Sequence, residues 1–210
     1  VQIDDAQTLV SMAQYSVVEF HPWNCAVHRP RVPGRLIFDL DPAPDVAFDS
    51  VIEAARELKQ RLEDIGLVPF CKTTGGKGLH VVTPLVPDDG ISWDQAKLFA
   101  QTLAARLAEE KPESYLTNMS KKKRTGRIFI DYLRNDETAT AVAPLSPRAR
   151  PNATVSMPVS WAQVKKGLDP QRFTIKTVPA LLKKSWAWSD YDKRARPLRK
   201  AIEALVGKGS

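Results

Sequence analysis

Two aspartates, Asp39 and Asp41, stand two residues apart near the end of the apolar segment Arg35–Asp41. In a β-strand, residues two apart point to the same face, so both carboxylates would share one face while Leu36, Phe38 and Leu40 face a core. Neighbouring carboxylates repel each other, and a fold tolerates them when a cation lies between them. An acidic strand end gives the same pattern, so this pair alone leaves a structural role open.

A third carboxylate strengthens the case for chemistry. Asp131 interrupts the apolar run Ile128–Leu133, where a charge in the middle of a strand is costly unless it is paired or bound to metal. Three carboxylates on two strands of one sheet predict a site for one or two divalent ions. Oxygen-only ligands favour Mg²⁺ or Mn²⁺ over zinc.

The glycine-rich loop between two further predicted strands, Thr74–His80, is the second candidate. Because it joins two strands, it is neither a Rossmann turn nor a Walker loop, both of which open a helix. Its glycines would let backbone N–H groups approach phosphate, while Lys77 adds charge and Thr74 a hydroxyl. Alone, the loop could be a plain hairpin and His80 a core histidine. Beside three carboxylates, triphosphate binding is favoured.

Charge is distributed unevenly along the 210 residues, whose net charge is +7. Residues 1–105 hold 9 basic and 14 acidic side chains, whereas residues 106–210 hold 22 and 10, for a net charge of +12. Such asymmetry predicts a polyanionic partner for the second half. The basic run Lys121, Lys122, Lys123 and Arg124 is a candidate DNA contact, although such runs are often solvated loops. No apolar stretch is long enough for a membrane span, and no membrane partner is expected.

Hydrophobic periodicity and capping signals predict an α/β chain that forms one domain over residues 1–210. Two capping boxes are expected to open long helices, one at Ser50 with Glu53 and one at Ser92 with Gln95. The expected strands are 35–41, 67–72, 80–84 and 128–133. The expected helices are 4–18, 50–66, 92–110, 160–166, 179–184 and 190–206, the last interrupted by Pro197.

Four motifs occur together in this order: His21-Pro-Trp-Asn24, Phe38-Asp-Leu-Asp-Pro42, Thr74–His80 and Ile130-Asp-Tyr-Leu-Arg-Asn135. Their order and spacing resemble the polymerase domain of bacterial ATP-dependent DNA ligase D, of the archaeo-eukaryotic primase superfamily, over residues 5–205. The resemblance implies a two-layer α/β (α+β) primase-polymerase core with an RRM-like, antiparallel or mixed sheet flanked by helices. It also implies a nucleotidyltransferase that adds rNTPs or dNTPs to primer 3′-OH ends of DNA during end joining.

Carried over to this sequence, the resemblance implies a two-metal site with Mn²⁺, or Mg²⁺, as the ions. Asp39 and Asp41 would bind both metals, and Asp131 would hold the catalytic metal at the primer 3′-OH. The residues expected at the incoming nucleotide are His21, Thr74, Gly76, Lys77, His80, Arg134 and Arg148.

The resemblance further implies Ku and a fused or separate ligase domain as partners, and a bacterial cytoplasmic location at the nucleoid. The absence of an initiator Met suggests a fragment of a longer chain. The family's N-terminal segment, which recognises a 5′-phosphate and stacks on template, is absent from these residues. Two other functions compete: a haloacid-dehalogenase-like phosphatase, which also begins with Asp-x-Asp, and a catalytically inactive nucleic-acid-binding module. Pro42 and Ala43 after Asp41 argue against the phosphatase.

Overall fold

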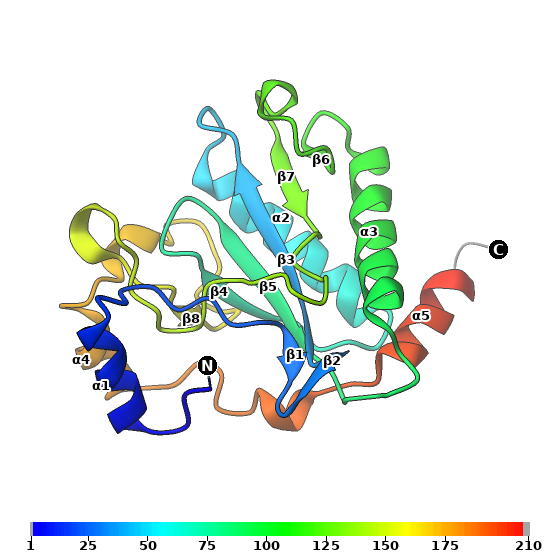
Figure 1. Cartoon of the computed structure of the whole chain (residues 1–210). Helices are drawn as coiled ribbons and strands as arrows, with labels where there is room; N and C mark the ends of the chain where they lie inside the picture. The colour runs from blue at the N-terminus through cyan, green and yellow to red at the C-terminus, as the bar shows by residue number, and fades with distance from the viewer. Residues whose placement is uncertain (1, 208–210) are drawn as a thin grey trace.

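A computed structural model describes residues 2–207 and shows a six-stranded sheet with its two longest helices packed on one face (Figure 1). The helices are α1 (Ala6–Gln14), α2 (Phe48–Glu63), α3 (Trp93–Glu110), α4 (Val178–Leu182) and α5 (Leu198–Gly207). The strands are β1 (Cys25–Ala26), β2 (Arg29–Pro33), β3 (Arg35–Pro42), β4 (Phe70–Thr73), β5 (Leu79–Pro84), β6 (Tyr115–Leu116), β7 (Ile128–Asp131) and β8 (Pro158–Val159). Short 3₁₀ turns cover Lys121–Lys123, Pro151–Ala153, Pro170–Arg172 and Asp192–Arg194.

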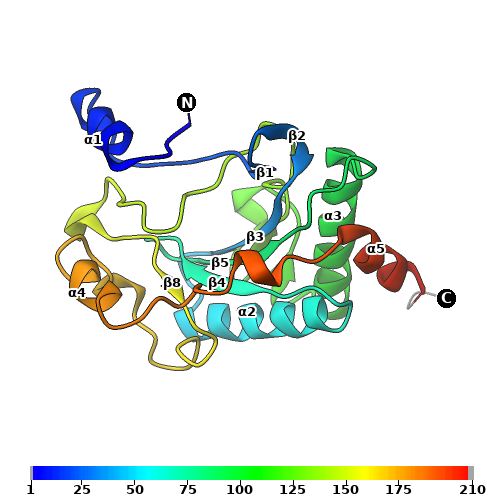
Figure 2. The same cartoon turned by 90° about the horizontal axis from the view of Figure 1, so that it is seen from below.

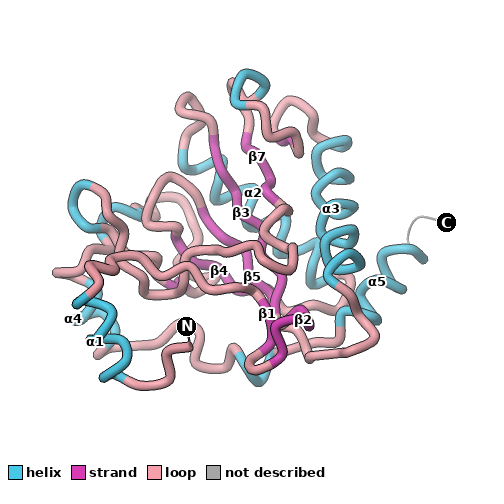
Figure 3. The backbone as a smooth tube through the Cα atoms, viewed as in Figure 1, coloured by secondary structure: helices cyan, strands magenta, loops and turns pink. Residues whose placement is uncertain are grey.

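The sheet has the strand order β6-β7-β3-β5-β4-β8. The pair β6-β7 is parallel and the other pairs are antiparallel, so the sheet is mixed. A separate two-stranded ribbon, β1-β2, lies beside it (Figure 3). This arrangement confirms the predicted α/β class with a mixed sheet and flanking helices.

The two faces of the sheet have different cover. Leu36, Phe38 and Leu40 of β3 are fully buried in one large core, to which the apolar stripes of α2 and α3 contribute. Figure 2 shows α2 beneath the sheet and mostly irregular segments above it. The alternate residues of β3 therefore point to the face that loops cover, and Asp39 and Asp41 are among them.

The long helices show which capping prediction was correct. The Ser92 box forms as predicted: its hydroxyl accepts from the Gln95 amide and the Gln95 side chain accepts from the Ser92 amide. The Ser50 box is wrong, because α2 begins at Phe48 after Ala47, so Ser50 already lies inside the first turn. Gly66 ends this helix region with a φ of 83°, a left-handed conformation that suits glycine.

Other predicted bounds were too long. Residues 160–166 form turns rather than a helix. The last predicted helix is interrupted at Pro197, as expected, and divides into a 3₁₀ turn and α5. Strand β7 ends at Asp131 because the carboxylate of Asp131 accepts from the Leu133 amide and turns the chain. Among residues 2–207, no helix is both long and apolar enough to cross a membrane.

Candidate active site

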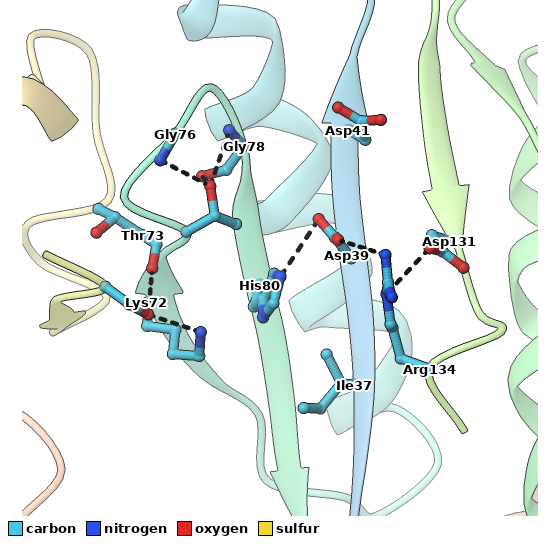
Figure 4. Close-up of polar contacts among 12 residues, drawn as sticks. Ile37, Asp39, Asp41, Lys72, Thr73, Gly76, Gly78, His80, Asp131 and Arg134 are labelled. Atoms are coloured by element: carbon cyan, nitrogen blue, oxygen red, sulfur yellow. Dashed lines mark hydrogen bonds and ion pairs between the residues drawn. The ribbon is translucent and has the colours of Figure 1, made fainter. Parts of the chain in front are cut away.

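Four polar side chains form one row across the sheet, because strand register places them opposite one another. Lys72 of β4 pairs with His80 of β5, His80 pairs with Asp39 of β3, and Asp39 pairs with Asp131 of β7. Figure 4 shows this row from Lys72 to Asp131 across four strands. We call these four residues the polar row.

An apolar row lies two residues away on the same face. Phe70 and Ile37 each pair with Val82, and Trp188 and Tyr191 pack over them. The aromatic rings stack closely, with the Trp188 and Tyr191 centroids 4.9 Å apart. This cover excludes water on one side of the polar row and leaves its other side open to a cleft.

Two arginines balance the three carboxylates. Arg134 lies between Asp39 and Asp131, with its Nε 3.1 Å from Asp131 Oδ2 and its Nη2 3.8 Å from Asp39 Oδ2 (Figure 4). Arg124 donates from Nη1 to Asp41 Oδ2 at 2.6 Å and stacks over the ring of Phe129. The carboxylate repulsion expected from the sequence is therefore offset by guanidinium groups in the protein itself.

Burial sets the protonation of the polar row. Burial lowers the pKa of His80 to about 4, with the Lys72 charge acting in the same direction, so the ring is neutral at pH 7. Burial raises the pKa of Asp131, and Arg134 only partly offsets this effect. For Asp39, burial acts upward, but His80, Arg134 and Lys72 outweigh it and hold its pKa below the ordinary value. The pKa values of Asp39 and Asp131 are thus shifted in opposite directions.

Lys72 is the member of the polar row that sequence reasoning missed. Its side chain is 1% exposed, and Nζ donates to Ser156 Oγ at 2.8 Å. Burial lowers the Lys72 pKa to about 7, although the charge of Asp39 raises it. A lysine directly before a predicted loop is a common surface residue, so no local pattern indicated its burial.

The glycine-rich loop folds around the Thr74 hydroxyl. Thr74 Oγ1 accepts from the amides of Gly76 and Gly78 at 3.1 and 3.3 Å and lies 3.1 Å from the Gly78 carbonyl. Gly78 rests directly on β3, since an added Cβ would overlap the carbonyl oxygen of Leu40, between Asp39 and Asp41. The loop is therefore placed immediately beside the aspartates, with its threonine turned inward to hold its shape.

A distant segment, residues 145–157, clamps this loop from the other side. Arg148 Nη1 donates to the Thr74 carbonyl, and the Thr154 hydroxyl donates to the Gly75 carbonyl. Arg148 thereby reaches the site, as predicted. The same segment brings in Arg150, whose guanidinium lies near Gly76 and which sequence analysis left out of the site.

A cleft of about 400 Å³ joins these parts. Every residue that was predicted to contact the nucleotide lines it: His21, Thr74, Gly76, Lys77, His80, Arg134 and Arg148. Asp39 and Asp41 also line it, whereas Asp131 lies just behind Arg134. Residues that sequence reasoning did not select, Thr140, Ala141, Val142 and Arg150, complete the wall.

Two of the four sequence motifs end in an asparagine, and both asparagines are buried and bond to the backbone near the cleft. Asn24 donates to the Arg134 carbonyl at 2.8 Å, and Asn135 exchanges hydrogen bonds with the backbone of Ile37 at 2.8 Å in both directions. Both side chains are 0% exposed. The Asn135 side chain therefore bonds to the edge of β3 as a neighbouring strand would. Together, Asn24 and Asn135 fix the backbone that carries Arg134.

The predicted DNA-contact residues separate in the structure. Lys121, Lys122 and Lys123 are exposed on a 3₁₀ turn. Arg124, the next residue, turns back to Asp41 and is only 14% exposed. The lysines are free to meet a polyanion, while Arg124 belongs to the carboxylate site.

The sequence matches the family described as "LigD, primase-polymerase domain" over residues 1–188. It is 34% identical, over 100% of its length, to the multifunctional non-homologous end joining protein LigD of Pseudomonas aeruginosa, and covers 25% of that protein. It is 37% identical, over 77% of its length, to LigD of Mycobacterium tuberculosis H37Rv and covers 22% of it. The chain thus spans about a quarter of the length of these relatives.

Among solved structures, the chain resembles the polymerase domain of Mycobacterium tuberculosis ligase D in complex with DNA, with a TM-score of 0.80 and 32% identity. The match covers 92% of this chain and 69% of that one. The family match and the Pseudomonas relative, which matches over the whole of this chain, confirm the family that the sequence resembles. The chain belongs to the LigD primase-polymerase domain family, a family of nucleotidyltransferases whose relatives act in non-homologous end joining.

Proposed function

We propose that this domain adds nucleotides from rNTPs or dNTPs to the 3′-OH end of a DNA primer during the repair of double-strand breaks by end joining. The observation that carries the proposal is the two-sided cleft. One side holds the aspartates of β3, and the other holds the cationic side chains Lys77, Arg148 and Arg150. A nucleoside triphosphate with divalent cations has the charges that match both sides.

Carboxylate oxygens are the ligands that hard divalent cations prefer, and strand pairing places these carboxylates close to one another. Asp39 and Asp131 are directly opposite on paired strands, and Asp41 follows on the same face. Within residues 2–207, no three acidic, His or Cys side chains are grouped tightly enough to hold a metal as they stand, because arginines occupy the carboxylates. Two Mn²⁺ or Mg²⁺ ions held by Asp39, Asp41 and Asp131 would supply charge stabilisation for phosphoryl transfer.

The basic side of the cleft would bind and orient the triphosphate. Lys77 is exposed at the tip of the glycine-rich loop, and Arg148 is fixed by the Thr74 carbonyl. Nε2 of the neutral His80 lies 3.3 Å from Asp39 Oδ1, so the ring contacts that carboxylate. His21 and Arg134 line the same cleft and complete the predicted nucleotide contacts.

DNA would approach along the exposed lysines Lys121, Lys122 and Lys123. The mycobacterial relative has been solved in complex with DNA, which supports DNA as the partner of this domain too. We extend the proposal to Ku and to a fused or separate ATP-dependent ligase domain as partners, and to the bacterial cytoplasm, at the nucleoid, as the location.

Primer extension tests this function directly. A recessed DNA duplex is incubated with rNTPs or dNTPs and with Mn²⁺ or Mg²⁺, using the wild type and Asp39→Asn. We expect extension by the wild type and a loss of at least about 100-fold in the variant, because charge at the reacting phosphate would be unbalanced. Glu109→Gln, at an exposed position of α3, should extend normally.

The competing functions give different results in the same experiment. DNA binding without extension under any metal would favour an inactive nucleic-acid-binding module. Release of inorganic phosphate from a phosphomonoester, without primer extension, would favour a phosphatase. Either result would contradict the polymerase proposal.

A further inference from the structure

We propose that Glu19 is a positioning residue that holds His21 and Arg148 in the orientation in which they bind the triphosphate of the incoming nucleotide. The proposal rests on the polymerase function proposed above. Glu19 precedes the His-Pro-Trp-Asn motif and lies outside the motifs that sequence reasoning selected.

The carboxylate of Glu19 makes three contacts, one within its own segment and two with a distant segment. Oε2 lies 2.8 Å from His21 Nε2 and 2.9 Å from Arg148 Nε, and Oε1 accepts from the Ala149 amide at 2.8 Å. Both side chains that it touches line the cleft, while Glu19 does not. Glu19 therefore acts behind the nucleotide contacts, at the point where they meet.

The charge on Glu19 is maintained by these contacts. Partial burial acts to raise its pKa, but the hydrogen bonds from His21, the Ala149 amide and Arg148 outweigh burial and lower it. An ionised carboxylate only accepts hydrogen bonds, so His21 must carry its proton on Nε2. The carboxylate thereby fixes the orientation of the ring beside the cleft.

Arg148 is held at two ends in the same way. Its Nε donates to Glu19 and its Nη1 to the Thr74 carbonyl, so the guanidinium spans from Glu19 to the glycine-rich loop. A planar guanidinium with two fixed donors presents its remaining N–H groups in one direction. Pre-orientation of this kind lowers the entropy cost of binding an anion.

Glu19 is not needed to bring the two segments together. Backbone bonds already pair them, from the Ala143 amide to the Phe20 carbonyl at 2.8 Å and from the Ala141 amide to the Pro22 carbonyl at 3.4 Å. The Phe20 amide also donates to Ser146 Oγ at 2.9 Å. Loss of the Glu19 carboxylate should therefore free the side chains of His21 and Arg148 without separating the chain segments that carry them.

The test compares Glu19→Gln and Glu19→Ala with the wild type, and uses Glu109→Ala as the matched control at an exposed glutamate. Binding of inorganic tripolyphosphate is measured by calorimetry without metal or DNA, and KM and kcat are measured in primer extension. We expect Glu19→Ala to weaken tripolyphosphate binding and raise the nucleotide KM about tenfold, with Glu19→Gln intermediate, because a neutral amide keeps some of the contacts. The DNA affinity and the melting temperature should be unchanged.

A coupling measurement separates positioning from simple loss of structure. In a protein that already carries His21→Ala and Arg148→Ala, Glu19→Ala should have no further effect on tripolyphosphate binding, because the residues through which it acts are gone. Full additivity of the three substitutions would overturn the proposal. Equal or tighter tripolyphosphate binding by Glu19→Ala would also overturn it, since Glu19 would then only neutralise Arg148. A wild type that binds tripolyphosphate but never extends a primer would instead refute the polymerase function and leave the binding result as the test of Glu19.

Discussion

The two sides of the cleft are built in different ways. The acidic side stands on the sheet, where strand register fixes Asp39, Asp131 and His80 opposite one another. The basic side stands on loops, where Lys77 and Arg150 are exposed and Arg148 is held by hydrogen bonds between segments far apart in the chain. One side is therefore fixed by the backbone pairing of the sheet, and the other is positioned by a few side-chain hydrogen bonds.

The two constructions suit two different tasks of the proposed polymerase site. Carboxylates that balance charge at a reacting phosphate need fixed spacing, and a sheet provides it. Side chains that capture a triphosphate must also release pyrophosphate, which is easier from solvated loops. Substitutions on the sheet side should therefore change stability and activity together, whereas those on the loop side should change ligand binding alone.

The largest effect is expected where the two sides meet. Gly78→Ala would drive a methyl group into the Leu40 carbonyl, because the loop lies directly on β3. We expect a loss of about 3 kcal/mol in the free energy of unfolding, measured with urea, together with loss of nucleotide addition. Gly207→Ala, which has open space around its Cβ, is the control and should be neutral. An unchanged urea midpoint for Gly78→Ala would show that the loop can move off the sheet.

Buried Lys72 should make the sheet side sensitive to pH. Its pKa falls from 10.5 to about 7 on folding, so between these values the unfolded chain binds more protons and stability rises with pH. Lys72→Met removes this dependence, and the difference between wild type and variant should change by about 1 kcal/mol per pH unit in this window. Urea unfolding at pH 7, 8.5 and 10 measures it.

The exposed lysine Lys193 supplies the control for this experiment. Lys193→Met should leave the pH dependence of stability as it is in the wild type, because the Lys193 side chain is exposed and outside the polar row. Parallel pH profiles of the wild type and Lys72→Met would contradict the lowered pKa of the buried Lys72.

On the loop side, Lys77→Ala should affect nucleotide binding alone. Removal of one solvated charge from the basic side should raise the nucleotide KM about tenfold, with kcat, melting temperature and DNA affinity close to wild type. Steady-state primer extension at several nucleotide concentrations measures the change. Equal losses of nucleotide and DNA affinity would place Lys77 on the DNA path instead.

The same contrast explains how far the fold and the site could be predicted. Alternation along 35–41 indicated the correct face for Asp39 and Asp41, because the period of a strand is fixed by its backbone. The capping box predicted at Ser92 forms, and the one predicted at Ser50 does not. A helix can begin before a capping pattern when packing favours the earlier start, and Ser50 then lies inside the first turn. Local patterns thus predicted the sheet side well.

Contacts between distant segments left no local pattern. Nothing around Glu19 or Lys72 indicates a partner more than 80 residues away, yet Glu19 meets Arg148 and Lys72 meets Ser156. Arg124 shows the converse, because its place in a basic run suggested DNA, while the fold pairs it with Asp41. The roles of such residues can be recognised only in the folded structure, where the topology places their partners beside them.

The smallest expected effect is on the salt dependence of DNA binding, and it can be tested because Lys122 and Lys123 lie apart from Arg124 and the carboxylates. Lys122→Ala with Lys123→Ala neutralises exposed charges and leaves the carboxylate site untouched, whereas a variant of Arg124 would disturb Asp41 as well. If both lysines bind phosphate groups of duplex DNA, each substitution should make the slope of log affinity against log salt shallower by about 0.9. The change should be the same for unrelated sequences, because phosphate contacts carry no base information.

Fluorescence anisotropy of a labelled duplex between low and moderate salt measures this slope, and tripolyphosphate binding without DNA should stay at the wild-type value. Lys165→Ala with Lys166→Ala, at another exposed pair in the basic half, is the matched control. An unaltered slope for Lys122 and Lys123, with a shallower one for Lys165 and Lys166, would move the DNA path away from the 3₁₀ turn beside β7. The basic residues that bind DNA would then lie in the segment after β8, and DNA would reach the cleft from the edge of the sheet opposite β6.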